Sequence, residues 1–146
     1  LGKKAGAIVF IGDILKSVIA FLICSVVFKD HATIAGLFGS AGAVLGHNYP
    51  FYMQFKGGKG VAATIGIFLA TDIRILVLAG VPALILLATT KYMSLASLSY
   101  MLLLVVVSAV FYIGTPIGLE VMLLVLVLSI SGFYYTHFLE ILNIFI

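Results

Sequence analysis

Long apolar stretches, separated by short polar breaks, run along the whole chain. Continuous apolar runs predict helices rather than membrane barrel strands, in which polar and apolar residues alternate. The segment 61–70 is shorter than the roughly 20 residues that a full membrane span needs, so it predicts a short or tilted helix. The six apolar segments, each an expected helix, are residues 6–28, 32–45, 61–70, 73–88, 93–112 and 117–135.

Composition identifies lipid as the solvent for most of this surface. Hydrophobic residues make up 64% of the 146 residues and charged residues only 9%, whereas a typical soluble domain is about half apolar and a quarter charged. Backbone polar groups in lipid must be satisfied internally, so the expected fold is all-α, a polytopic transmembrane helix bundle. We expect residues 1–146 to form a single integral membrane domain.

Small residues are concentrated in the second apolar segment. Gly42 and Gly46 have the GxxxG spacing, and Gly36 and Gly39 precede them. Small residues let helix backbones approach closely in lipid, so this pattern predicts helix packing rather than a functional site.

The distribution of cations predicts the orientation. If the first helix starts inside, Lys29 and Arg74 fall at the outer side. The other side then receives five lysines, and this majority marks it as cytoplasmic. These five are Lys3, Lys4, Lys56, Lys59 and Lys91.

The polar segment from His47 to Gly60 is the strongest candidate for chemistry. Its Phe-Lys-Gly-Gly-Lys-Gly core sets two cations among glycines, whose backbone amides can approach an oxyanion closely. The segment is not a nucleotide-binding P-loop, because Gly60 follows Lys59 and Met53 occupies the position of the first glycine. It predicts a phosphate cradle, and the alternative is an ordinary cytoplasmic loop with lysines.

Other polar residues fall on the same predicted face. Asp13 and Lys16 share one helix face, either as a mutually neutralising pair or as a pair that orients a polar site. Ser94 is either a helix N-cap or a hydroxyl for a bound phosphate. A lone histidine such as His47 is more often structural, but its neighbours favour a site. Cys24, the single cysteine, allows no intrachain disulfide and no CxxC metal site.

The segment 46–64 resembles the bacterial acyl-phosphate:glycerol-3-phosphate acyltransferase family, whose motif GHxxPxxxxFKGGKGVA it carries. Residues 1–6 with 13–16, and residues 91–95, also match family stretches, so the resemblance covers nearly the whole chain. It implies a multi-pass enzyme of the bacterial inner membrane with seven helices, of which about six are present, and an active site on the cytoplasmic face. Such enzymes transfer a fatty acyl group from acyl-phosphate to the 1-hydroxyl of glycerol 3-phosphate, giving lysophosphatidic acid for phospholipid synthesis. No metal, other cofactor, nucleotide or nucleic acid is implied.

The resemblance also implies roles for individual residues. Lys59, His47 and His137 are the candidate catalytic residues. The candidate substrate-binding residues are Lys56, Gly57, Gly58, Gly60, Ser94, Asp13 and Lys16.

The chain departs from the family pattern at three places. The first helix and its loop are expected before Leu1, Ser17 stands in place of a glycine, and the last motif keeps only His137 and Ile141. We therefore expect an N-terminally incomplete chain with a degenerate C-terminal end. The alternatives are a catalytically degenerate member and a small transporter or channel for a phosphorylated solute, although the almost purely apolar outer halves of the helices argue against transport.

Overall fold

The computed structural model describes residues 3–51 and 57–145, with side chains at residues 4–51 and 57–134. Over these residues the chain is all-helical, as predicted. The elements are α1 (Lys3–Val27), the 3-10 helix η1 (Lys29–His31), α2 (Ala32–Asn48), α3 (Val61–Thr71), α4 (Ile73–Thr90), α5 (Met93–Tyr112) and α6 (Gly118–Phe145).

Three predicted helix bounds are wrong. The helix α1 begins at Lys3 and not at residue 6. The helix α2 continues beyond residue 45 to Asn48, so His47 belongs to a helix and not to the loop. It ends there because Tyr49 precedes Pro50, and the residue before a proline is disfavoured in the α conformation. The helix α6 continues through the tail that we expected after residue 135, because that tail contains neither glycine nor proline to stop it.

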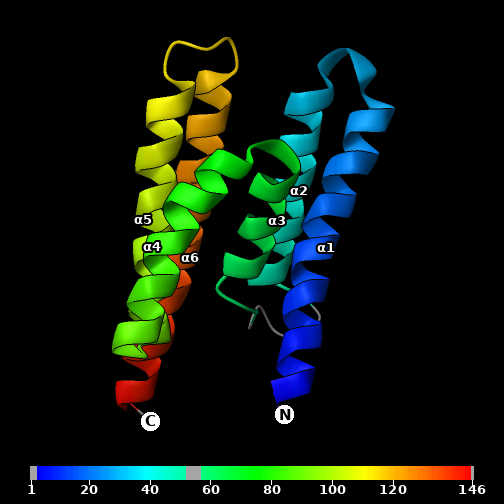
Figure 1. Cartoon of the computed structure of the whole chain (residues 1–146). Helices are drawn as coiled ribbons and strands as arrows, with labels where there is room; N and C mark the ends of the chain where they lie inside the picture. The colour runs from blue at the N-terminus through cyan, green and yellow to red at the C-terminus, as the bar shows by residue number, and fades with distance from the viewer. Residues whose placement is uncertain (1–2, 52–56, 146) are drawn as a thin grey trace.

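The helices run up and down in two groups, which meet where α2 contacts α6 and where α3 contacts α4 and α5 (Figure 1). The hairpin α1–α2 packs against α3, whereas α4, α5 and α6 pack on one another in sequence order. The start of α1, the α2–α3 connection and the α4–α5 connection lie at one end (Figure 1). We call this the lysine-rich end, because Lys4, Lys59 and Lys91 belong to these segments. The predicted gathering of these segments on one face is therefore confirmed.

Glycines determine how closely α1 and its neighbours pack. A Cβ atom on Gly36 would lie 2.6 Å from the ring of Phe21, and one on Gly39 would meet Cys24, so these glycines carry the α1–α2 contact. By contrast, a Cβ atom on Gly42 or Gly46 would have no neighbour within 4 Å among the described residues. The small-residue pattern therefore predicts packing correctly, but its GxxxG pair is not the part that packs.

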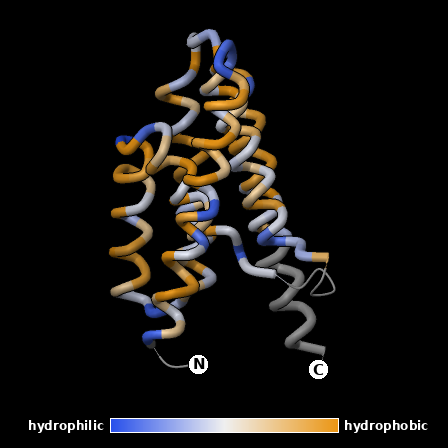
Figure 2. Tube along the Cα trace, turned by 90° about the vertical axis from the view of Figure 1, so that its right-hand side faces the viewer, coloured by the Kyte–Doolittle hydropathy of each residue, from blue (hydrophilic) through white to orange (hydrophobic). Residues whose placement is uncertain are grey.

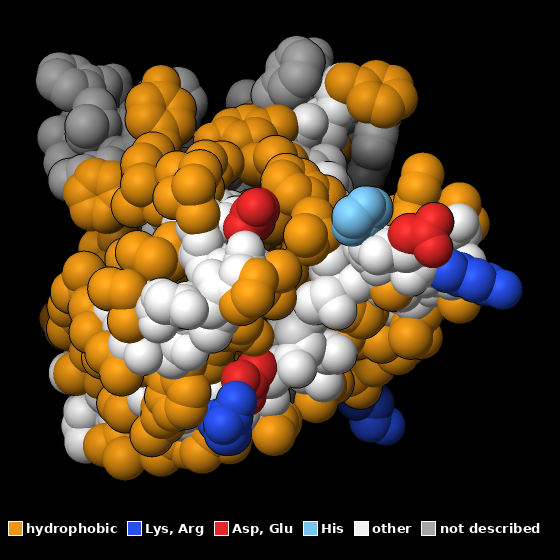
Figure 3. Space-filling view, turned by 90° about the horizontal axis from the view of Figure 1, so that it is seen from above, with side chains coloured by type: hydrophobic (Ala, Val, Ile, Leu, Met, Phe, Trp, Pro, Cys, Tyr) orange, Lys and Arg blue, Asp and Glu red, His pale blue; other side chains and the backbone are white. Residues whose placement is uncertain are grey.

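The outer surface is that of a membrane protein. Three described helices are long and apolar enough to cross a bilayer, at Lys4–Val27, Ile73–Thr90 and Met93–Tyr112. Hydrophobic residues run along the helices (Figure 2), and many of the large ones are exposed. The view onto the end opposite the lysine-rich end shows mainly hydrophobic side chains with a few scattered charges (Figure 3).

Asp72 caps α4 at the junction with α3. Its side chain accepts hydrogen bonds from the backbone N–H of Arg74 at 3.0 Å and from two guanidinium nitrogens of the same residue. The guanidinium hydrogen bonds lower the pKa of Asp72, so the cap is charged at neutral pH. A carboxylate whose pKa is lowered by folding stabilises the fold above its unfolded-state pKa and loses that effect as the pH falls through the lowered value.

Removing this cap gives a stability prediction. Replacing Asp72 with alanine is expected to lower the free energy of unfolding by about 1 kcal/mol at pH 7, the usual cost of losing an N-cap. Denaturation in mixed detergent micelles measures the change. Asp72→Asn, which keeps an acceptor for the Arg74 N–H, should lose less, and equal losses in the two variants would argue against the cap.

Candidate functional site

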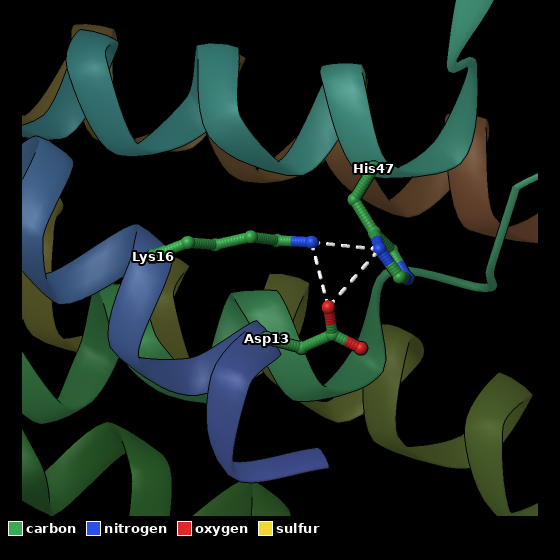
Figure 4. Close-up of polar contacts among 3 residues, drawn as sticks. All are labelled: Asp13, Lys16 and His47. Atoms are coloured by element: carbon green, nitrogen blue, oxygen red, sulfur yellow. Dashed lines mark hydrogen bonds and ion pairs between the residues drawn. The ribbon is translucent and has the colours of Figure 1, made fainter. Parts of the chain in front are cut away.

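The predicted Asp13–Lys16 pair and His47, which the sequence does not connect to it, form one contact cluster. Asp13 and Lys16 come from α1 and His47 from the last turn of α2, and their side chains converge between the two helices (Figure 4). Lys16 Nζ lies 2.7 Å from Asp13 Oδ1 and 2.7 Å from His47 Nδ1. Asp13 Oδ1 lies 3.3 Å from the same imidazole nitrogen. The acid–base pair is therefore not only mutually neutralising, since it also holds His47.

A second contact joins the glycine-rich loop to α5. Lys59 Nζ donates a hydrogen bond to Ser94 Oγ at 2.8 Å, and both side chains are partly buried. Of the two alternatives for Ser94, the N-cap is wrong, because Tyr92 is the residue that precedes α5. Ser94 lies inside the first turn, so its hydroxyl points across to the loop instead. Lys59 is thus a positioned cation rather than a freely moving surface lysine.

The glycines of the loop fold it against the end of α2. The backbone N–H of Gly58 donates to the carbonyl of His47 at 3.2 Å. A Cβ atom on Gly57 would lie 2.6 Å from the carbonyl oxygen of Asn48, and one on Gly58 would clash with His47 Nε2. Gly60 has a positive φ of 75°, which favours glycine, and it directly precedes α3. The N-terminal amide groups of α3 therefore face the loop, an arrangement that suits an anion.

Sequence reasoning missed a buried polar pair that fixes this end of α2. Asn48 is fully buried, and its side-chain NH₂ donates to Ser131 Oγ of α6 at 2.9 Å. Its other side-chain atom, Oδ1, has no hydrogen-bond partner in the described part of the chain and would lie 2.5 Å from a Cβ on Gly60. The available signal was the type of residue: an asparagine within an apolar helix is costly unless it is paired.

The Asn48–Ser131 pair gives a second stability prediction. Asn48→Ala and Ser131→Ala should each destabilise the protein. A double-mutant cycle should yield a coupling energy of about 0.6 kcal/mol, the average for hydrogen bonds between membrane helices, and at most about 1.7 kcal/mol. Unfolding in mixed micelles measures it. Ser108→Ala is the matched control, because this buried hydroxyl has no hydrogen-bond partner among the described residues and its loss should be close to neutral. Additive effects of the two site variants would show that the pair contributes no coupling.

The side chains of two predicted site residues lie outside the described part of the structure. Lys56 lies outside the described residues. His137 lies within α6, but its side chain is outside the described part of the structure. The remaining predicted residues all lie around the loop. They form two contact groups, one around His47 and one around Ser94, and the loop residues Gly58 and Lys59, which are adjacent in sequence, contact one group each.

An apolar cavity adjoins this region. It has a volume of about 470 Å³ and lies among α3, α4 and α5, with Phe10 of α1 at its margin. Val61, two residues after Lys59, and Ser97, one turn beyond Ser94, are part of its lining. A positioned cation and an apolar cavity thus lie along the same helices.

These features define a class: a multi-pass membrane protein with a cationic, glycine-lined loop beside an apolar cavity at one end of the bundle. Comparison with known sequences names the family. The family of glycerol-3-phosphate acyltransferases matches residues 1–145, and the chain belongs to it.

Individual relatives support this assignment. A glycerol-3-phosphate acyltransferase of Clostridioides difficile is 40% identical over 100 residues, which are 66% of this chain and 49% of the relative. The enzyme of Alkaliphilus metalliredigens is 36% identical over 135 residues, 92% of this chain and 64% of the relative. The chain therefore spans between about half and two thirds of the length of these relatives.

Solved structures share the fold. The integral membrane glycerol 3-phosphate acyltransferase PlsY, in its lysophosphatidic acid form, superposes with a TM-score of 0.78 and 30% identity over 97% of this chain and 69% of that one. Its glycerol 3-phosphate form gives a TM-score of 0.75 and 28% identity over 99% of this chain and 70% of that one.

Proposed function

We propose that this chain transfers a fatty acyl group from acyl-phosphate to the 1-hydroxyl of glycerol 3-phosphate, forming lysophosphatidic acid and phosphate. The observation that carries the proposal is the Lys59–Ser94 contact within a glycine loop at the N-terminus of α3. Both proposed substrates carry phosphate, and lysine, backbone amides and a helix N-terminus all favour an anion. The names of the relatives support the same acceptor, glycerol 3-phosphate.

The proposed reaction is a direct acyl transfer. The glycerol 1-hydroxyl oxygen bonds to the acyl carbonyl carbon, and the bond from that carbon to the phosphate oxygen breaks. The released phosphate takes the electron pair, and the hydroxyl proton passes to a phosphate oxygen of the substrates. Because acyl-phosphate is already activated, no covalent enzyme intermediate is required. Lys59 and the loop amides stabilise the negative charge that develops on the leaving group.

The apolar cavity accounts for the other half of the donor. A fatty acyl chain is apolar, and the side chains of Ile65, Leu76 and Leu84 in the cavity lining offer it an apolar surface. The chain would therefore lie among α3, α4 and α5 with its phosphate end at Lys59.

The lysine distribution supports a location for this chemistry. Lys4, Lys59 and Lys91 belong to the lysine-rich end, whereas Lys29 lies in η1 and Arg74 in the first turn of α4, both toward the other end. By the positive-inside rule we place the lysine-rich end in the cytoplasm of a bacterial cell, with the bundle in its inner membrane.

Acyl transfer in reconstituted vesicles tests this function. Purified protein is supplied with radiolabelled glycerol 3-phosphate and either palmitoyl-phosphate or palmitoyl-CoA. We expect labelled lysophosphatidic acid with palmitoyl-phosphate and none with palmitoyl-CoA. Label that accumulates unmodified inside the vesicles would indicate a transporter instead, and absence of both product and uptake would indicate a degenerate member.

A further inference from the structure

The contacts of His47 determine which of its ring nitrogens carries the proton. A lysine ammonium group has three N–H donors and no acceptor. At 2.7 Å from Lys16 Nζ, His47 Nδ1 must therefore be the acceptor, and the ring proton lies on Nε2. Asp13 does not reverse this assignment, because its oxygen is farther from Nδ1, at 3.3 Å, and itself accepts from Lys16 at 2.7 Å.

The two charges beside the ring act in opposite senses: the carboxylate of Asp13 favours the imidazolium, whereas burial of the ring, together with the ammonium of Lys16, favours the neutral imidazole and lowers the pKa of His47. The charged groups that contact His47 among the described residues are Asp13 and Lys16, both from α1. An imidazolium would carry a proton on Nδ1 and direct it at the Lys16 ammonium, which places two like charges at hydrogen-bond distance. Lys16 thus occupies the acceptor nitrogen of the imidazole and disfavours its protonated form.

The opposite nitrogen faces the glycine-rich loop. A Cβ atom on Gly58 would clash with His47 Nε2, so this nitrogen lies directly against the backbone that precedes Lys59. The hydrogen bond from Gly58 N to the His47 carbonyl holds the loop there. The Nε2–H group is therefore presented to the part of the loop where the phosphate is proposed to bind.

We infer that His47 is a fixed hydrogen-bond donor to a substrate phosphate and not a general base. Because Nε2 already carries a proton and Nδ1 is occupied by Lys16, the ring has no open nitrogen to accept the proton of the glycerol hydroxyl. Lys16 and Asp13 are positioning residues that set the tautomer. This inference rests on the proposed function for the identity of the ligand, but the tautomer stands on the geometry alone.

Nitrogen NMR tests the tautomer without any activity. The full chain is labelled with ¹⁵N-histidine in detergent micelles, and the His47 signal is identified by its loss in His47→Gln. We expect the neutral Nε2–H form at neutral pH. In Lys16→Met the acceptor contact is gone and Asp13 remains, so we expect a shift to the Nδ1–H form or to imidazolium. An Nδ1–H signal in the unmodified protein would overturn the inference.

Two substitutions test the donor role. The side-chain amide nitrogen of glutamine can replace His47 Nε2, whereas that of asparagine replaces Nδ1. We therefore expect kcat/KM of His47→Asn to be lower than that of His47→Gln by about 10-fold or more, the effect of losing a hydrogen bond to a charged group. Equal losses in both variants, or a pH–rate break near neutrality that disappears in His47→Gln, would show a general base instead. If unmodified protein makes no lysophosphatidic acid while the Nε2–H form is observed, the proposed function fails and the tautomer holds.

Discussion

Replacing Lys59 with methionine is expected to lower kcat/KM for acyl transfer by about 10²- to 10³-fold, the usual cost of removing a positioned electrostatic group from an active site. The ammonium group is held by Ser94 at 2.8 Å, beside the loop glycines and the start of α3. Methionine keeps the apolar stem and removes only the charge. Initial rates of lysophosphatidic acid formation, with palmitoyl-phosphate and glycerol 3-phosphate varied in turn, measure the effect.

Two further variants make this result specific. Lys29→Met makes the same change in net charge at the other end of the bundle and should leave the rate unchanged. Ser94→Ala keeps the ammonium group of Lys59 but removes its hydrogen bond to Ser94, so the decrease in kcat/KM should be smaller than in Lys59→Met. If Lys59→Met and Lys29→Met had equal rates, Lys59 would have no place in the site.

Replacing Gly58 with alanine is expected to lower kcat/KM by about 10²-fold, the cost of displacing a reacting group by about 1 Å. The new methyl group would occupy the position of His47 Nε2, so either the imidazole or the loop must move. Both movements disturb the Lys59 side chain or the His47 donor. The same acyl-transfer assay measures the loss, and denaturation in mixed micelles shows whether the fold is retained.

The chain offers a glycine control for this change. Gly42→Ala adds the same methyl group where nothing described lies within 4 Å, on an exposed part of α2. Alanine also has the higher helix propensity, so this variant should be active and at least as stable as the unmodified protein. Full activity in Gly58→Ala would mean that the loop does not need its close approach to His47.

The helices could be predicted because their signals are local. Apolar runs ended by glycine, proline or charged residues located α3, α4 and α5 within two residues of their observed ends. The spacing of Asp13 and Lys16 likewise places them together within a single helix, and the structure confirms the contact. The errors at the ends of α2 and α6 arose where polar residues, which a helix tolerates, were read as helix stops.

The contacts that assemble the site could not be predicted, because they depend on how the helices pack. His47 meets Lys16 only because Gly36 and Gly39 bring α2 close to α1, and Lys59 meets Ser94 across 35 residues of sequence. The Asn48–Ser131 pair spans 83 residues and carries no motif that marks it. The sequence could indicate which residue types suit a phosphate, but not which of them would share a hydrogen bond.

Equilibrium binding of radiolabelled glycerol 3-phosphate to the purified chain in lipid nanodiscs tests the phosphate cradle most directly. We predict saturable binding that is displaced by unlabelled glycerol 3-phosphate but not by glycerol. Lys59→Met should weaken this binding by at least about 10-fold, as expected for a lost charge-assisted contact. Lys29→Met should leave it unchanged. Binding that glycerol displaces equally well, or that survives Lys59→Met undiminished, would contradict a phosphate site at this loop.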